Sequence, residues 1–196
     1  MKTLLRPALS LFAALTVLTG VVYPLAVTGV SQLLFPQEAN GSIVKVNGKA
    51  VGSALIGQQF SSPGYFWGRP SATGPQAYNA AASSGSNLGP LNPALSDAVK
   101  ARIEALKSAD PGNDLPVPID LVTASASGLD PDISLAAAYY QATRVAKTRN
   151  LSIERAKTLI EQYAKRPRFG VFGEPRVNVL GLNRALDERF GAPPPQ

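Results

Sequence analysis

The chain has 196 residues and a formal net charge of +6, and it contains neither histidine nor cysteine. Without these two residue types, disulfides, zinc sites and Ser-His or Cys-His nucleophile pairs are excluded. Lysine and arginine are interspersed with aspartate and glutamate, which favours a mixed solvated surface over a nucleic-acid-binding one. We therefore expect no catalytic residue, no metal ligand and no nucleic-acid partner.

An uncharged and mostly apolar stretch runs from Pro7 to Gln37. A helix needs roughly 20 apolar residues to cross a bilayer. The stretch therefore predicts a transmembrane helix over residues 7–36. The alternative is a cleaved signal peptide, whose apolar core is usually only about 7–15 residues long. Ala26-Val27-Thr28 is a weak candidate for its cleavage site.

Positive charge precedes the predicted helix at Lys2 and Arg6, and the first charge after it is Glu38. The positive-inside rule then places residues 1–6 in the cytoplasm and residues 37–191 outside. We expect a single-pass protein of the inner (plasma) membrane with a periplasmic domain. The proline-rich end, residues 192–196, is expected to be disordered.

Several residues inside the predicted membrane helix bear on its shape and packing. Pro24 removes one backbone hydrogen bond and is expected to kink the helix. Gly20, Gly29, Thr16 and Thr19 are small or hydroxylated and suit contact with another membrane helix. Such residues are also common in single membrane helices, so both interpretations stay open.

The extracytoplasmic part begins with a predicted hairpin. Residues 43–46 and 51–56 read as strands, and Asn47-Gly48 between them is a strong signal for a two-residue turn. Further on, residues 72–92 form an uncharged tract rich in small and polar residues. A tract of that length predicts a loop that is either functional or a linker.

Six helical or extended patterns follow, and they predict an α+β domain. Asn92 and Pro93 fit the start of a helix, as N-cap and first residue. Asp130 and Pro131 predict the start of the next helix in the same way, and Ser152 caps a third. The predicted elements are a helix from residue 93, a buried strand over 119–124, a helix over 132–148, a helix from 153, a strand over 177–180 and a helix over 182–190.

Few residues have a spacing that suggests chemistry. The small-residue turn at 124–130 resembles an anion-binding turn ahead of a helix, but helix capping explains it more simply. Asp130 with Asp132, and Glu174 with Arg176, are imaginable acid–base pairs. Neither pair has a recognisable catalytic spacing. From the residues alone, we expect an anchored, outward-facing domain that is a subunit and not an enzyme.

Seven motifs spread over the chain, in order, resemble the C subunit of the Kdp-type potassium-transporting P-type ATPases. They are residues 5–8 (LRPA), 52–58 (GSALIGQ), 65–72 (YFWGRPSA), 84–89 (SGSNLG), 121–130 (LVTASASGLD), 144–151 (RVAKTRNL) and 177–183 (VNVLGLN). Each motif is weak evidence alone, but together they span nearly the whole sequence, including the membrane segment.

The resemblance implies one transmembrane helix, a periplasmic domain and a role in high-affinity potassium uptake. It implies three partners in the same complex: a potassium-channel-like subunit, an ATP-hydrolysing P-type subunit and a small membrane subunit. It also implies a catalytic chaperone that raises the pump subunit's affinity for ATP. ATP and K+ would be used by the complex, and we expect this chain to bind no cofactor of its own.

The aromatic and uncharged region between residues 61 and 89 is where we expect contact with the channel-like subunit. Phe60, Phe66 and Trp67 near its start either plug the core or face a partner. The alternative function is an independent, membrane-anchored periplasmic ligand-binding domain. The residues expected at the partner contact are Tyr65, Phe66, Trp67, Arg69, Tyr78 and Asn87.

Overall fold

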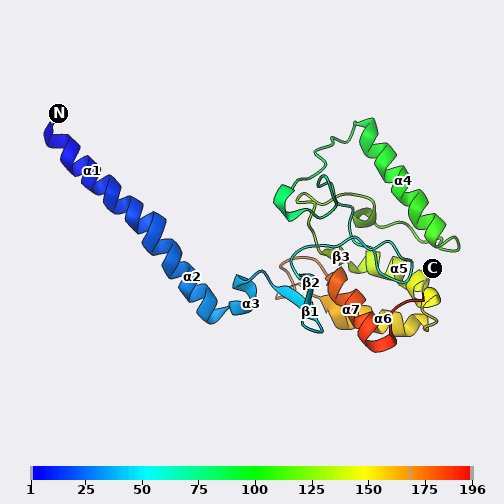
Figure 1. Cartoon of the computed structure of the whole chain (residues 1–196). Helices are drawn as coiled ribbons and strands as arrows, with labels where there is room; N and C mark the ends of the chain where they lie inside the picture. Colours follow the sequence, from blue (N-terminus) through cyan, green and yellow to red (C-terminus); the bar gives the residue numbers. More distant parts are fainter. Residues whose placement is uncertain (1, 168, 195–196) are drawn as a thin grey trace. The chain divides into compact units, whose positions relative to one another are not determined.

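The computed structural model describes residues 2–167 and 169–194 of the chain. By its internal contacts the chain divides into two compact units, Met1–Val51 and Gly52–Gln196. Figure 1 shows the elements of both units, and each unit is described here by itself.

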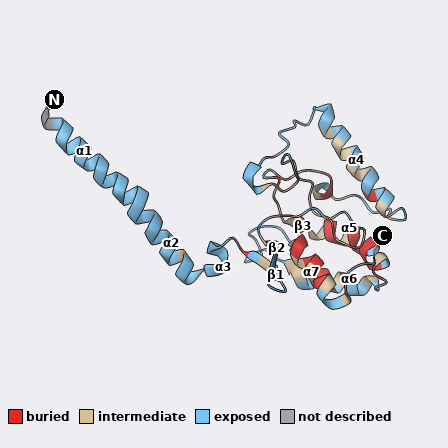
Figure 2. Cartoon of the chain, viewed as in Figure 1, coloured by how far each residue is buried: buried red, intermediate tan, exposed pale blue. Residues whose placement is uncertain are grey.

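The N-terminal unit is dominated by a long helix. It consists of α1 (Lys2–Val17), a π-helical turn η1 (Leu18–Val22) and α2 (Tyr23–Leu34). Residues Leu4–Leu34 form a stretch long and apolar enough to cross a membrane. Its side chains have almost no intramolecular cover, as Figure 2 shows. The prediction of a spanning helix is confirmed by length and composition, with its limits two to three residues nearer the N-terminus than expected.

The π-helical turn lies directly before Pro24. The Tyr23 N–H donates to the Leu18 carbonyl, five residues back, instead of four. Proline lacks an N–H and its ring would clash with the carbonyl of Gly20 in a regular α-helix. One wider turn relieves that clash, so Pro24 changes the helical register where a kink was expected. The Thr16 and Thr19 hydroxyls donate to the carbonyls of Phe12 and Leu15 within the same helix.

A short helix, α3 (Pro36–Ala39), and a two-stranded sheet complete this unit. Strand β1 (Ile43–Val46) pairs with β2 (Lys49–Ser53), as predicted. Asn47 and Gly48 join them with φ angles of 50° and 78°, the double positive φ of a type I′ turn. The second strand ends earlier than expected, because Leu55 N–H donates to the Ser53 hydroxyl and begins a turn.

The described part of the C-terminal unit contains four longer helices. They are α4 (Pro93–Ala109), α5 (Leu135–Thr148), α6 (Ile153–Tyr163) and α7 (Val179–Phe190). Each begins at a polar cap: the side chains of Asn92, Ser134, Ser152 and Asn178 accept hydrogen bonds from backbone N–H groups of the first turn. The predicted caps Asn92 and Ser152 are therefore confirmed.

A small antiparallel sheet lies beside these helices. Its order is β3 (Asp132–Ser134), β5 (Arg176–Asn178) and β4 (Ala164–Lys165). Val177 of the central strand is opposite Ile133 on one side and Ala164 on the other. The last helix starts immediately after β5, so the predicted strand at 177–180 and helix from 182 are each shifted by one to three residues.

The hydrophobic core is built mainly from α5, α6, α7 and β5. Figure 2 shows the buried residues concentrated where these elements face one another, whereas α4 is mostly uncovered. Phe66 is fully buried within this core although it belongs to no helix or strand, and Phe60 and Trp67 pack against it. Of the two expectations for these aromatic residues, the structure supports core packing.

Two local predictions are wrong. Residues 119–124 do not form a buried strand, because Ile119–Leu121 is a 3-10 helix (η3) and the Ile119 side chain is exposed. Asp130 does not cap the following helix, because residues 132–134 are β3 and Ser134 is the cap. The Ser134 N–H and hydroxyl also donate to the Asp120 carboxylate, which stabilises this later helix start.

Candidate functional site

Residues 60–71, which we call the strap, cross the C-terminal unit without pairing with any strand and make one turn at residues 62–65. Asn183 of α7 uses its side-chain amide in place of a neighbouring strand: Phe66 N–H donates to its Oδ1 at 2.8 Å, and its Nδ2 donates to the Phe66 carbonyl at 2.9 Å. Gln141 of α5 does the same for Trp67, at 2.8 and 3.1 Å. Both amides are about 1% exposed, so the strap's buried backbone is satisfied by side chains.

Two arginines hold the N-terminal half of the strap. Arg144 donates to the carbonyls of Pro63 and Tyr65, and its guanidinium lies 4.3 Å from the centre of the Trp67 ring. Arg149 donates to the Gly64 carbonyl and lies 4.8 Å from the Tyr65 ring. Planar guanidinium groups suit this combination of carbonyl contacts and stacking on an aromatic face.

Arg149 also connects the strap to the end of the chain. Arg149 pairs with Asp187 at 2.8 Å and donates to the Gly191 carbonyl at 2.6 Å. A Cβ added to Gly64 would come within 2.5 Å of Pro193, so only glycine fits there without displacing a neighbour. The start of the segment expected to be disordered therefore rests on the strap, and residues 195–196 lie outside the described part of the chain.

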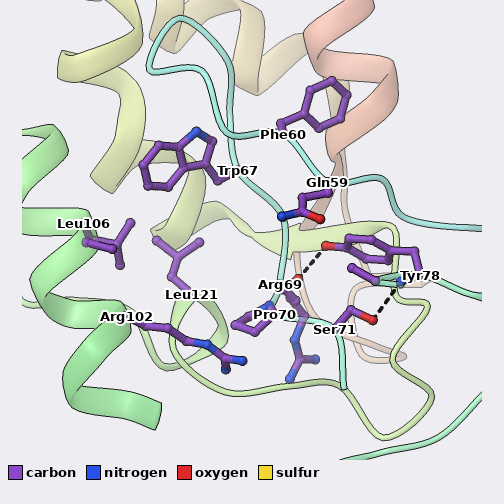
Figure 3. Close-up of a pocket in the computed structure, with 13 residues that line it drawn as sticks. Gln59, Phe60, Trp67, Arg69, Pro70, Ser71, Tyr78, Arg102, Leu106 and Leu121 are labelled. Carbon is purple, nitrogen blue, oxygen red and sulfur yellow. Dashed lines mark hydrogen bonds between the residues drawn. The ribbon is translucent and has the colours of Figure 1, made fainter. Parts of the chain in front are cut away.

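An open cavity of about 320 Å³ lies beside the strap, between it and α4. Figure 3 shows Trp67, Tyr78, Arg102 and Leu121 around it. The Tyr78 hydroxyl donates to the Arg69 carbonyl, which joins the loop after the strap to the strap itself. Arg69 in turn pairs with Asp130 at 3.1 Å. The strap is thus tied on one side to the helices and on the other to the turn before β3.

Burial changes the acidity of several groups around the strap. Burial, with a smaller contribution from Asp130, raises the pKa of Tyr78 to about 12. Burial lowers the pKa of Arg144 to about 10, while Asp110 partly opposes that shift. Burial also lowers the pKa of Arg102, which donates to the Val122 carbonyl at 3.1 Å. In each case burial is the largest cause of the shift, and Arg144 itself is only 3% exposed.

A second cavity, of about 500 Å³, holds the residues that had been considered as acid–base pairs. Here Arg176 pairs with Asp132 at 2.8 Å, and Arg69 pairs with Asp130. Asp130 also accepts the Asp132 N–H, as in a local turn. Each aspartate is therefore engaged by an arginine from another element, in agreement with a structural role in capping and surface pairing.

The small-residue turn at 124–130, which had been weighed as an anion-binding turn, has the same structural character. No helix starts directly after residues 124–130, since β3 follows them. Gly128, with φ of 67°, lies against Ser84 of the long loop, and its carbonyl accepts the Ser71 hydroxyl. The turn therefore holds the strap and the 72–92 loop. Among residues 2–167 and 169–194, no group of three or more acidic side chains is arranged to bind a metal ion.

The six predicted partner-contact residues divide into three groups. Phe66 is 0% exposed, so its side chain meets a partner only if the domain opens. Tyr65, Trp67, Arg69 and Tyr78 are half-buried and have intramolecular partners. Asn87 is exposed on the long loop. The contact itself stays a prediction.

Sequence reasoning missed the side chains that position the strap. Helical periodicity puts Gln141 and Arg144 on the polar face of their helix, yet both are buried. Asn183 and Asp187 were assigned no structural or functional role from the sequence. The only available signal was weak. Arg144, Arg149 and Asn183 fall within the motifs 144–151 and 177–183 of the family resemblance, and helix periodicity does not explain polar residues at these positions.

The described part of the chain combines one N-terminal helix long and apolar enough to cross a membrane with one α+β domain, in which buried amides and arginines hold a structural strap. This combination defines a class of proteins with one candidate membrane span and one folded domain. Comparison with known proteins makes this assignment specific. The family model KdpC, described as the c chain of K+-transporting ATPases, matches residues 5–188. The chain belongs to this family.

Named relatives match over almost their entire length. The potassium-transporting ATPase KdpC subunit of Dechloromonas aromatica is 67% identical over 187 residues, which cover 95% of this chain and 98% of the relative. The corresponding subunit of Herminiimonas arsenicoxydans is 65% identical over 188 residues, covering 96% and 99%. The match includes the membrane segment, the strap and the residues that hold it. The family resemblance of the seven motifs is thereby confirmed.

Proposed function

We propose that this chain is the non-catalytic accessory subunit of a high-affinity, ATP-driven potassium uptake complex. Its partners are the channel-like subunit that takes K+, the P-type subunit that hydrolyses ATP and a small membrane subunit. The single observation that carries the proposal is the family match from residue 5 to residue 188, which includes both the candidate span and the domain. The polar groups buried around the strap support it, because they are engaged in holding the fold.

The proposed arrangement has the N-terminus in the cytoplasm and the domain on the periplasmic side of the inner membrane. Lys2 and Arg6 before the span and the lack of charge until Glu38 support this orientation. ATP is then on the opposite side from the domain. An effect of this chain on ATP affinity, as a catalytic chaperone, must therefore pass through the membrane helix or through the channel-like subunit.

The domain is proposed to cover the potassium entrance of the channel-like subunit with the side that carries the strap and the long loop. Trp67, Tyr78 and Asn87 are the positions at which to test this contact, since each is at least partly exposed. A photocrosslinking residue at these positions should capture the channel-like subunit in the assembled complex. The same residue at Glu154, 77% exposed on α6, serves as the control and should capture less. Equal capture at all four positions, or none, contradicts the proposed contact.

The accessory role is tested by deleting the chain from a host that depends on this complex at limiting potassium. Growth should fail at micromolar K+ and recover at high K+, and the remaining subunits should co-purify less well. In the purified complex, loss of the chain should raise the ATP concentration needed for half-maximal hydrolysis. Unchanged growth, assembly and ATP dependence would contradict the proposal and favour the independent ligand-binding domain.

The orientation has a direct test because the chain has no cysteine. In Leu91→Cys the new thiol replaces a side chain that is 96% exposed. A membrane-impermeant maleimide should label it in intact spheroplasts, and the unsubstituted chain provides the unlabelled control. Labelling that requires permeabilised membranes would place the domain in the cytoplasm.

A further inference from the structure

The hairpin loop between β4 and β5 presents an apolar tip to solvent. Its side chains Phe169, Val171 and Phe172 are 92, 75 and 70% exposed. Strands β4 and β5 pair directly, so this loop projects from the edge of the sheet and not from the core. Three neighbouring large apolar side chains with this exposure indicate a surface that meets something other than water.

The backbone conformation keeps these side chains outside. Phe169 has a φ of 54°, which bulky residues rarely adopt, and Gly170 and Gly173 have φ of 76° and 91°. The Gly170 N–H donates to the Pro167 carbonyl and closes the turn. Strain of this kind persists where the surrounding structure requires it and is common at functional loops. The exposed aromatic residues are therefore a feature of a formed turn.

Charge around the tip points to the kind of surface it meets. The sequence from Lys165 to Arg176 contains four basic residues and one acidic residue, Glu174. Two of the basic residues are paired with carboxylates of neighbouring elements, Arg166 with Glu161 and Arg176 with Asp132. Aromatic side chains flanked by lysine and arginine are typical of segments that lie in the interface of a bilayer with anionic lipids. A protein-binding surface of three side chains alone would be far smaller than the roughly 800 Å² per partner of a specific interface.

A short segment of the chain tethers the domain to the candidate span. The candidate span ends at Leu34 and the domain begins at Gly52. The 17 residues between them reach at most about 60 Å when fully extended, and less with α3 and the hairpin folded. A bilayer that holds the span would therefore stay within reach of the domain whichever other subunits are present.

We propose that Phe169, Val171 and Phe172 insert into the outer headgroup region of the same bilayer that holds the N-terminal helix. The domain then has two membrane attachments, the span and this loop, which together limit its rotation over the membrane. The proposal rests on the anchored arrangement proposed above, and it adds a lipid contact to it.

The test uses the full chain in the assembled complex, in vesicles of phosphatidylcholine with a minor fraction of phosphatidylglycerol. In a complex whose other subunits lack accessible cysteines, Phe172→Cys and the control Leu91→Cys each carry a fluorescent label. Nitroxide lipids should quench position 172 at least about twofold more than position 91, because an interfacial segment lies only about 5–10 Å deep. Adding Phe169→Ser and Val171→Ser should remove that difference, whereas Leu115→Ser should not.

Three results would overturn the proposal, and a fourth would test the membrane anchor separately. Equal quenching at positions 172 and 91, or a label at 172 that is open to aqueous quenchers, excludes insertion. A label at 172 that is shielded from water but not quenched by lipid, and that crosslinks to another subunit, identifies a protein partner instead. A label at Leu15→Cys reports the span separately: if it is not quenched by lipid, the anchored arrangement itself fails.

Discussion

The side-chain amide of Asn183 brackets the backbone of Phe66, accepting from its N–H at 2.8 Å and donating to its carbonyl at 2.9 Å. The two residues are 117 positions apart, and both are almost completely buried. This pairing replaces the ladder of a neighbouring strand and places the Phe66 ring between the helices. It fixes the strap to the core at Phe66, while most other strap residues are half-buried.

Replacing Asn183 by alanine should therefore destabilise the domain strongly. Two buried backbone groups would lose their partners, at about 1–3 kcal/mol each, so we expect a loss of roughly 2–4 kcal/mol in the free energy of unfolding. Trp67 is the only tryptophan, so its fluorescence during urea unfolding of the full chain in micelles reports the strap. The exposed Gln76→Ala is the control, with a change within about 0.5 kcal/mol. Equal stability of the two variants would show that water replaces the amide at no cost.

Two neighbouring acidic residues on α7 should differ in their importance. Asp187 pairs with Arg149, whose side chain is 2% exposed, and also accepts the Tyr65 hydroxyl. Glu188 pairs with Arg184 at the surface, one helical turn away. Asp187→Ala leaves a buried guanidinium with less compensation and should cost about 1–3 kcal/mol. Glu188→Ala should cost less than about 0.5 kcal/mol. Matching losses in urea unfolding would contradict the role given to the Arg149 contact.

Tyr78 should make stability depend on pH in the alkaline range. Its pKa is about 12 in the folded chain against 10.0 when unfolded. The unfolded chain therefore loses the phenol proton first, and the stability that Tyr78 contributes below pH 10 is lost as pH rises toward 12. We expect Tyr78→Phe to reduce this decline by roughly 1–2 kcal/mol, after allowance for partial exposure.

The comparison of the two chains isolates Tyr78 from other groups. Arg144, whose lowered pKa acts in the opposite direction over part of this range, is present in both. The measurement is urea unfolding of the full chain at several pH values between 9 and 11. Parallel pH profiles for the two chains would mean that the phenol titrates in the folded state as it does in the unfolded state.

Pro24→Ala should convert the π-helical turn at Leu18–Val22 into regular α-helix, because the clash that the wider turn relieves is gone. Removing the extra residue of that turn rotates the two halves of the span relative to each other by about 100°. Backbone chemical shifts in micelles measure the change. Pro7→Ala is the control, since Pro7 lies inside α1 without a π-helical turn beside it. If the shifts of Leu18–Val22 are unchanged, the bulge has another cause.

The sequence predicted the structure well wherever residues close together in the chain determine it. The membrane helix follows from a long apolar run, the Asn47-Gly48 turn from two residues that tolerate positive φ, and the starts of α4 and α6 from their polar caps. The family resemblance likewise follows from motifs read directly along the chain.

Prediction from sequence was weaker where a hydrogen bond from a distant segment changes the local structure that a residue favours. Asp130 before a proline has the pattern of a helix cap, but its carboxylate is taken by Arg69, 61 positions earlier. Residues 119–124 are apolar enough for a buried strand, but Asp120 is bound to the cap of α5 and the segment turns into a 3-10 helix. In both cases a tertiary hydrogen bond overrides the local preference.

Sequence alone determined the candidate span, the α+β character of the domain and the family, because these depend on periodicity, caps and contiguous motifs. Only the tertiary structure decided that Gln141, Arg144 and Asn183 are buried. A helical pattern shows which face is polar, but it does not show that a strap from another part of the chain will cover that face. The strap's backbone must be hydrogen-bonded once it is buried, and these three side chains supply the partners.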